Sequence, residues 1–319
     1  MPRFAKAMMC TLSSFLVAAC GANDTGSPNT GATSKPTQSG PTEDATGKAY
    51  DALTAGEQDR VTQVIADVDD EVAKDPTDGH ATFYSAIMRF WQLGEEIDVP
   101  SNPVDELTEA QTMIDRFRKA QAMLPDDDRA PAFGGLAKVV IGNITSNTDL
   151  QAEGMSDIEK GIQIFPAYSH FLRALASAES PAGSDAFAVV LPEMQAVLDT
   201  CGAKTDASGG AVYPKGPLPT ELRPCNDEGI VPHVWEGFLL NYGDLLLKAG
   251  KSADEARAMY EGAKAAPRFD EWPYASTLQD RIDDADDRAA LYADSDPSND
   301  PKIWMQDGHI CTGCHQDEK

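Results

Sequence analysis

Apolar residues recur with helical spacing through most of the chain between residues 49 and 292. Two groups show the spacing i, i+3, i+4, i+7: Tyr84, Ile87, Met88 and Trp91, and then Phe187, Val190, Leu191 and Met194. This spacing places apolar side chains on one face of an α-helix. No run alternates with a period of two for long enough to predict a strand, so we expect an all-α fold over this range.

The clearest periodic segment is 233–266, which predicts a helix-turn-helix hairpin. Its first helix has an apolar stripe of Trp235, Phe238, Leu239, Tyr242, Leu245 and Leu246. Gly250 ends that helix, and Ser252 with Glu255 forms a capping box for the second. The second helix should turn Ala256, Met259, Tyr260 and Ala263 inward, before Pro267.

Similar hairpins are expected elsewhere, because prolines follow the ends of several periodic segments. These ends are Asp75-Pro76, Leu124-Pro125, Phe165-Pro166 and Ala266-Pro267. The segment 255–267 resembles the second helix of a tetratricopeptide repeat, although the 34-residue period of that family is not kept. The resemblance implies about five stacked helical hairpins, which form a tetratricopeptide-like α-solenoid over residues 49–292.

The first twenty residues have the layout of a secretion signal. Arg3 and Lys6 precede an apolar stretch of about 13 residues, which is shorter than the ~20 that a bilayer span needs. The ending Leu16-Val17-Ala18-Ala19-Cys20 resembles a bacterial lipoprotein signal. This resemblance implies a signal peptide at 1–19 and acylation of Cys20, for example with palmitate. A plain secretory signal cleaved near Ala19 is the alternative.

The resemblance also implies a location. Gly21, and not aspartate, follows Cys20, which favours sorting to the outer membrane of a Gram-negative cell envelope. The anchored protein would face the periplasm or the exterior. Residues 20–48 then form a lipidated flexible linker, because Asn23 to Thr46 contains no large apolar residue and cannot build a core.

Charge narrows the class of partner. Removal of Arg3 and Lys6 with the signal leaves 24 of the 26 basic residues against 52 acidic ones, a formal charge of −28. This charge excludes a nucleic-acid surface and leaves the lipid anchor as the membrane attachment. The acidic residues are spread along the chain, which is typical of a solvated acidic surface. The functional alternative is an electric field that attracts a basic redox partner.

The last residues contain the most specific motif. Cys311-Thr312-Gly313-Cys314-His315 reads C-x-x-C-H, the attachment sequence of c-type haem. In such a motif Cys311 and Cys314 form thioethers with the haem vinyl groups and His315 is the proximal iron ligand. We therefore predict one covalent haem c on a short irregular tail, 293–319. The alternatives are a zinc site with His309, a strained Cys311–Cys314 disulfide, or a free thiol pair.

The sixth iron ligand is not evident from the sequence. No residue after His315 is a strong ligand, so the candidates lie upstream at Met305, His233 and His170. A histidine in a helical region is more often a structural residue, and we therefore expect an iron that is five-coordinate or weakly capped. Ile303, Trp304 and Met305 could cover one haem face or dock against the helices.

Two cysteines have no role in lipid or haem attachment. Cys201 and Cys225 bracket a segment rich in glycine and proline, and outside the cytoplasm we expect them to form a disulfide. A loop of this size gives about 3.5 kcal/mol of stabilisation. Two free thiols are the alternative.

No motif for common enzyme classes is present: there is no G-x-S-x-G, no G-x-x-x-x-G-K-[ST] and no H-E-x-x-H. We expect an electron carrier and not a catalyst, with a redox partner bound by the helical body. The alternative is a protein-binding scaffold of the cell envelope, of the tetratricopeptide-like class, whose tail holds no haem.

Overall fold

The computed structural model describes residues 44–99, 102–206, 208–212, 233–294 and 296–304. Over these residues the chain is almost entirely helical, which confirms the all-α prediction. The α-helices are α2 (Ala45–Ala55), α3 (Val61–Lys74), α4 (Gly79–Gly94), α5 (Pro103–Met123), α6 (Arg129–Thr145), α7 (Thr148–Ile164), α8 (Pro166–Ala178), α9 (Val190–Thr200), α10 (Val234–Lys248), α11 (Ala253–Ala263), α12 (Ala275–Asp283) and α13 (Ala285–Ala293). Short 3-10 helices lie at Gln58–Arg60 (η1) and Phe269–Glu271 (η3).

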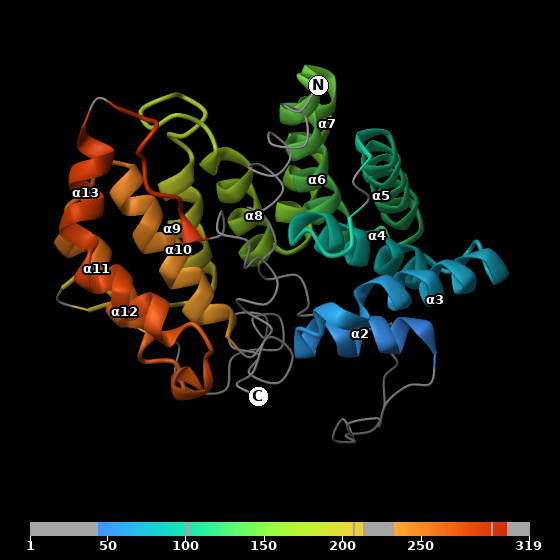
Figure 1. The fold of residues 1–319 in the computed structure, drawn as a ribbon, viewed down its shortest axis with the longest axis horizontal. Coiled ribbons are helices and arrows are strands. Elements are labelled where there is room, and N and C mark those ends of the chain that lie inside the picture. The colour runs from blue at the N-terminus through green and yellow to red at the C-terminus, as the bar shows by residue number, and fades with distance from the viewer. Residues whose placement is uncertain (1–43, 100–101, 207, 213–232, 295, 305–319) are drawn as a thin grey trace.

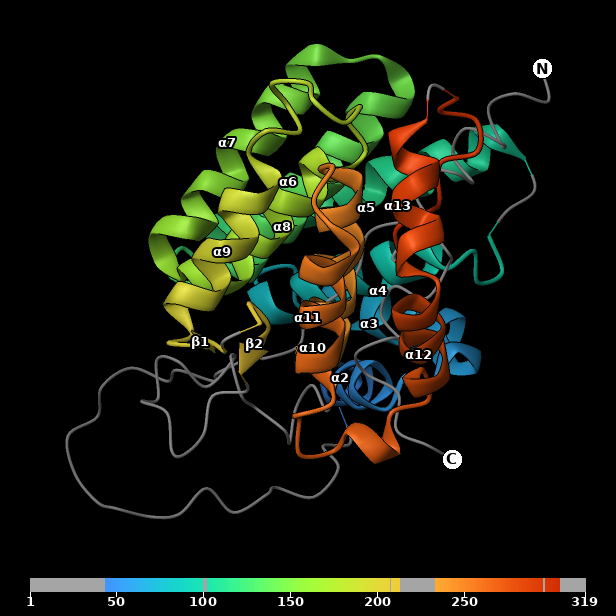
Figure 2. The same ribbon diagram turned by 90° about the vertical axis from the view of Figure 1, so that its left-hand side faces the viewer.

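Helices that follow one another in the chain pack against one another as hairpin-like pairs. A second set of contacts joins alternate helices, α2 with α4, α4 with α6 and α6 with α8. Figure 1 shows the pairs following one another around an arc, with α3 near one end and α12 and α13 at the other; Figure 2 shows the same body from the side. This is the stacked-hairpin architecture that the sequence predicts.

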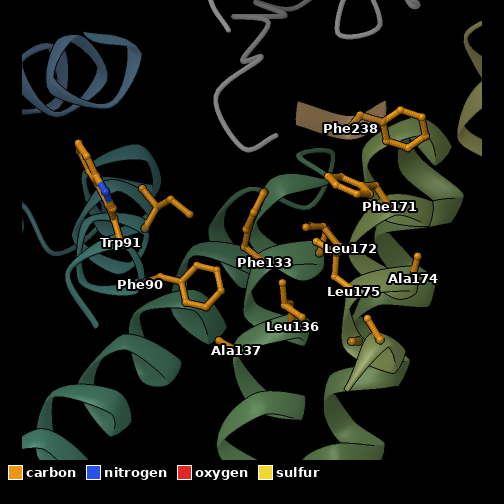
Figure 3. Close-up of a cluster of buried hydrophobic side chains, with 14 of the residues drawn as sticks. Phe90, Trp91, Phe133, Leu136, Ala137, Phe171, Leu172, Ala174, Leu175 and Phe238 are labelled. Carbon is orange, nitrogen blue, oxygen red and sulfur yellow. The ribbon is translucent and has the colours of Figure 1, made fainter. Parts of the chain in front are cut away.

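The core is continuous because several helices are buried around most of their circumference. Nearly every residue of α4, α6 and α10 is buried, which explains why their sequences are apolar on all faces. Figure 3 shows side chains of α4, α6 and α8 meeting in one layer, with Phe238 of α10 beside them. Phe90 lies 6.2 Å from Phe133, and Phe171 lies 5.3 Å from Phe238, between ring centroids. Both pairs meet edge to face, a favourable aromatic geometry.

The most extensive helix contact is between α6 and α7, and glycine permits the close approach of the two backbones. A Cβ atom on Gly135 would lie 2.5 Å from the carbonyl oxygen of Gly154, and the reverse substitution would be equally tight. Since no real Cβ contact is that short, larger residues here would push the two helices apart.

The predicted helix boundaries agree closely with the structure. Gly250, at the end of α10, has a φ of +74°. The next helix, α11, begins with the capping box, in which the side chains of Ser252 and Glu255 each accept a hydrogen bond from the other's backbone N–H. Helix α5 ends directly before Leu124, and Pro166 is the first residue of α8. Proline fits the first turn of a helix because the N–H that it lacks would have no partner within the helix.

Two boundaries differ from the sequence prediction. Helix α2 begins at Ala45 and not at residue 49, because the Asp44 side chain accepts a hydrogen bond from the N–H of Gly47 over 2.6 Å. Phe187 is buried as expected but lies in a turn before α9 and not within that helix. The side chain of Ser184 accepts a 3.2 Å hydrogen bond from the N–H of Phe187 and stabilises this turn.

The segment after α9 contains a small element that the sequence did not predict. The strands β1 (Lys204–Thr205) and β2 (Ala211–Val212) form a short antiparallel ladder. Between them, the side chain of Asp206 accepts a hydrogen bond from the backbone N–H of Gly210. Strands of two residues are too short to leave an alternating pattern in the sequence. In the part of the chain that the structure describes, no helix is long and apolar enough to cross a lipid bilayer.

Candidate functional site

The residues that the sequence marks as functional fall into two groups. Those outside the described residues are Cys20, Cys225, Met305, His309, Cys311, Cys314 and His315. Those that the structure places are Cys201, His170 and His233, together with the segment that leads to the C-x-x-C-H motif. The described candidate site is therefore the region where this leading segment, 296–304, meets the helices.

The leading segment is held against the helical body at its last two described residues. Ile303 and Trp304 are each only 1% exposed. The backbone N–H of Trp304 donates a hydrogen bond of 2.7 Å to Oδ2 of Asp244, in the middle of α10. Of the two roles considered for these apolar residues, the structure shows docking against the helices. Figure 1 shows the segment running back from the end of α13 across the helical body.

Two side chains of helix α13 bind the backbone of the same segment. The guanidinium of Arg288 donates a 2.8 Å hydrogen bond to the carbonyl oxygen of Lys302, and the hydroxyl of Tyr292 donates to the carbonyl oxygen of Pro301. Because these contacts use main-chain atoms, they set the path of the chain whatever the side chains are. The segment is thus attached at Pro301, Lys302 and Trp304, which lie seven to ten positions before Cys311.

A buried charge cluster stabilises this attachment. Asp244 is fully buried and accepts a 2.7 Å hydrogen bond from the hydroxyl of Tyr260. Arg281 of α12 and Arg288 of α13 lie 3.2 and 3.3 Å from its Oδ1. Burial and the nearby carboxylate raise the pKa of Tyr260 well above its usual value, so this phenol remains a donor. A buried carboxylate needs such partners, because an unpaired charge in the interior costs several kcal/mol.

Aromatic rings surround the docked tryptophan. The ring centroid of Trp304 lies 5.8 Å from that of Trp272 and 5.4 Å from that of Tyr274, both in edge-to-face geometry. These two residues belong to the connection between α11 and α12. The tail is therefore packed between that connection, α10 and α13.

His233 lies at the edge of this aromatic group. It is fully buried at the start of α10, and its ring centroid is 6.5 Å from that of Trp272. Its Nδ1 is 3.2 Å from Oε1 of Glu236, a carboxylate that is also buried. A carboxylate at Nδ1 orients the imidazole and favours the tautomer with the proton on Nδ1.

His170, the other histidine candidate, has a different environment on α8. Its Nδ1 is 2.5 Å from Oε2 of Glu193, and Arg173 lies 3.4 Å from the second oxygen of that carboxylate. These partners belong to α8 and α9 and not to the segments that contact the tail. His170 thus joins two helices of one hairpin, which is a structural role.

Cys201 is 2% exposed at the end of α9 and is disulfide-bonded. Its expected partner Cys225 lies outside the described residues, so the pairing of these two cysteines stays a prediction.

Other buried charges have structural partners. The ammonium of Lys138 on α6 contacts the carboxylates of Asp157 and Glu153 on α7. The hydrogen bonds from Arg118 and Lys138 lower the pKa of Glu153 to about 2. Within the described ranges, no group of three or more histidine, cysteine or acidic side chains is arranged to hold a metal ion.

Sequence reasoning did not identify Asp244, the residue on which the tail attachment depends. A usable signal was present, because Asp244 is the one charged residue within the run Phe238 to Leu247 of the most apolar helix. A carboxylate in such a run must be buried and paired. Its partners could not be named without the structure, since they come from four other segments: α11, α12, α13 and the segment that leads to the motif.

Comparisons of this chain with protein-family models, with curated proteins and with solved structures found no match. Function must therefore be argued from the residues themselves.

Proposed function

We propose that this protein is a lipid-anchored, extracytoplasmic c-type haem protein that exchanges single electrons with a protein partner bound by its helical body. The observation that carries the proposal is the C-x-x-C-H sequence at 311–315, in a chain whose start resembles a lipoprotein signal. The two features agree, because haem is joined to such cysteines only outside the cytoplasm.

The roles of the residues follow from the motif. Cys311 and Cys314 would hold the haem through thioethers, His315 would be the proximal ligand, and Cys20 would be the lipid attachment site. The haem would supply a reversible one-electron iron couple. The remaining task of the protein is to hold that group at a constant distance from the site of its partner.

The attachment of the preceding segment supports this task. Trp304 is held by Asp244, and Cys311 follows it by seven residues, a stretch that spans at most about 25 Å when fully extended. From the sequence alone, Cys311 could lie much further from the helices, because no contact between the tail after α13 and the helical body could be predicted. Anchoring at Trp304 would therefore limit how far the motif can lie from α10, α12 and α13.

The surface of this end of the molecule suits a basic partner. Asp283, Asp284 and Asp287, where α12 meets α13, are exposed. The nearby arginines 281 and 288 point inward to Asp244 and so do little to neutralise these carboxylates. Negative potential at the haem end would increase the rate of encounter with a cationic redox protein, most strongly at low ionic strength.

The test is a pyridine haemochrome spectrum of the purified protein, made in a bacterial host that has the machinery for covalent haem attachment. The expected result is a c-type spectrum, with a mass increase of one haem that survives denaturation. The matched control is Cys314→Ser, which should lose the covalent haem. A wild-type protein without haem would overturn the proposal.

The stacked helical pairs favour one second candidate, a scaffold that binds other envelope proteins without haem. Solenoids of this kind commonly offer extended binding surfaces. The two functions are distinguished by capture from envelope extracts: a scaffold without haem would retain its partners in the Cys314→Ser variant, and would show no haem in the wild type.

A further inference from the structure

We propose that the place where residues 301–304 dock is a peptide-binding site, which exchanges this segment for a non-helical segment of another protein. The peptide that fits has a basic residue followed by an aliphatic and an aromatic one. We call this place the tail site. It consists of the residues of α10, α13 and the α11–α12 connection that contact the docked segment: Asp244, Trp272, Tyr274, Arg288 and Tyr292.

The tail site binds the backbone of its occupant. Arg288 and Tyr292 donate hydrogen bonds to two successive carbonyl oxygens of the segment, and Asp244 accepts a hydrogen bond from one of its N–H groups. Residues 300–303 belong to no helix or strand, so these backbone groups are not used within the segment's own secondary structure. Since every peptide carries the same groups, this mode of binding suits other chains as well.

Two adjacent side chains provide the selectivity. Ile303 and Trp304 are each 1% exposed, whereas Lys302 before them is exposed. The ring of Trp304 lies edge to face with those of Trp272 and Tyr274, at centroid distances of 5.8 and 5.4 Å. Enclosed aromatic side chains of this kind dominate the affinity of most protein interfaces. The tail site therefore selects an aliphatic–aromatic pair.

Charge favours a foreign basic peptide over a second copy of this chain. The elements that form the tail site carry exposed carboxylates, among them Asp270, Asp283 and Asp287. These attract a basic residue at the position of Lys302, which the chain's own segment also has. Two whole copies of the chain repel each other, because each has a formal charge of −26.

The tail site is held together by the helices and not by its occupant. Tyr260, Arg281 and Arg288 all contact Asp244, and they belong to α11, α12 and α13. The docked segment also leaves two buried donors, Nε1 of Trp304 and Nε of Arg288, without a hydrogen-bond partner in the described part of the chain. Such donors weaken docking. The site thus persists when the segment leaves, and a peptide with a suitable acceptor can replace it.

The test uses full-length protein in which Ile303→Ala and Trp304→Ala are combined, here the emptied variant. A fluorescein-labelled peptide with the sequence of residues 299–304 is titrated and its fluorescence anisotropy measured. The emptied variant should bind it saturably. Wild type should bind it at least about tenfold more weakly, because its own segment competes at an effective concentration in the millimolar range. A peptide with alanine in place of tryptophan should not bind.

Further peptides test which features are recognised. A peptide that keeps only lysine, isoleucine and tryptophan in this order, with unrelated flanking residues, should bind within about threefold of the first, since the flanks add no buried contact. Glutamate in place of its lysine should weaken binding, and added salt should reduce that difference.

A pair of tyrosine variants tests the location of the bound peptide. In the emptied variant, Tyr292→Phe removes a donor to the peptide backbone and should weaken binding by about threefold to tenfold. Tyr242→Phe is the matched control, because the hydroxyl of Tyr242 contacts Gln195 of α9 and not the tail. This control should leave binding unchanged.

A measurement on wild type keeps the test decisive should the emptied variant fail to fold. Unlabelled peptide at millimolar concentration should displace the docked segment and so increase amide hydrogen exchange in protein fragments that span residues 301–304. No increase would overturn the proposal. So would a folded emptied variant that binds no peptide, or equal binding by wild type and the emptied variant. A wild-type dimer in light scattering that the emptied variant does not form would instead assign the site to a second copy.

Discussion

The backbone N–H of Trp304 donates a hydrogen bond of 2.7 Å to the carboxylate of Asp244, and so joins the tail to the middle of helix α10 across 60 positions of the chain. The same carboxylate pairs with arginines from α12 and α13. One buried charge therefore connects three helices and the segment that precedes the haem motif. We therefore expect both the stability of the protein and the position of the motif to depend on the carboxylate of Asp244.

Asp244→Asn should destabilise the protein by about 3 to 5 kcal/mol, because it leaves Arg281 and Arg288 without a buried counter-charge. Urea unfolding followed by circular dichroism measures the loss. The control is Asp286→Asn, which removes an exposed partner of Arg257 and should cost less than about 1 kcal/mol. Equal effects of the two variants would show that the buried cluster contributes no more than a surface ion pair.

Cys314→Ser and His315→Ala should change haem attachment without changing the fold. The motif comes after the helical repeats in the chain, and Trp304 is the last residue of the core among the described residues. We expect loss of covalent haem from Cys314→Ser and loss of the native haem spectrum from His315→Ala, with almost unchanged helical circular dichroism in both. A parallel fall in helicity would mean that haem is needed for the repeats to fold.

Cys20→Ser should release the protein from the membrane with its haem still attached. The reason is that acyl chains on Cys20 are the expected anchor, at about 0.8 kcal/mol for each buried CH₂ group. Fractionation of cells and labelling with a palmitate analogue measure the effect. A wild-type protein that takes up no label would contradict the lipoprotein assignment.

Cys201→Ala should lower the free energy of unfolding by about 2 to 4 kcal/mol, because the buried Cys201 is disulfide-bonded and the bond closes a loop. The haem spectrum should not change. Mass mapping without reduction should recover a peptide that links Cys201 to Cys225. Free thiols at both positions in protein from the envelope would refute the pairing.

Asp128 should make the stability of the protein depend on pH. Desolvation and the neighbouring Asp127 raise its pKa from 3.8 to about 7, although Arg129 opposes this. Since the folded state holds the proton more tightly than the unfolded state, this group reduces stability as the pH rises from about 4 to 7.

Asp128→Asn removes that dependence. The variant should match wild type near pH 4 and be more stable at pH 8, by on the order of 4 kcal/mol. Unfolding curves at the two pH values measure this difference. The control is Asp126→Asn, at an exposed position two residues earlier. This variant should change the free energy of unfolding by the same small amount at pH 4 and at pH 8. A gain in Asp128→Asn that is the same at pH 4 and pH 8 would contradict the proposed cause.

Much of the fold was determined by local sequence. The apolar stripe from Trp235 to Leu246, the stop at Gly250 and the capping box at Ser252 each depend on residues within a few positions of one another, and the structure confirms all three. Such signals are local because a helix forms its hydrogen bonds between neighbouring turns. The start of α2 was missed, since a single cap at Asp44 in a polar segment leaves little apolar periodicity.

The haem motif and the lipoprotein-like signal can likewise be read from sequence alone, because covalent attachment needs specific residues at fixed spacing. The position of Trp304 against Asp244, and of His233 against Trp272, could not be read in this way. These contacts join residues tens of positions apart, and they exist only because the helices stack in one order. Tertiary packing therefore decided which carboxylate holds the tail and which histidine lies beside it.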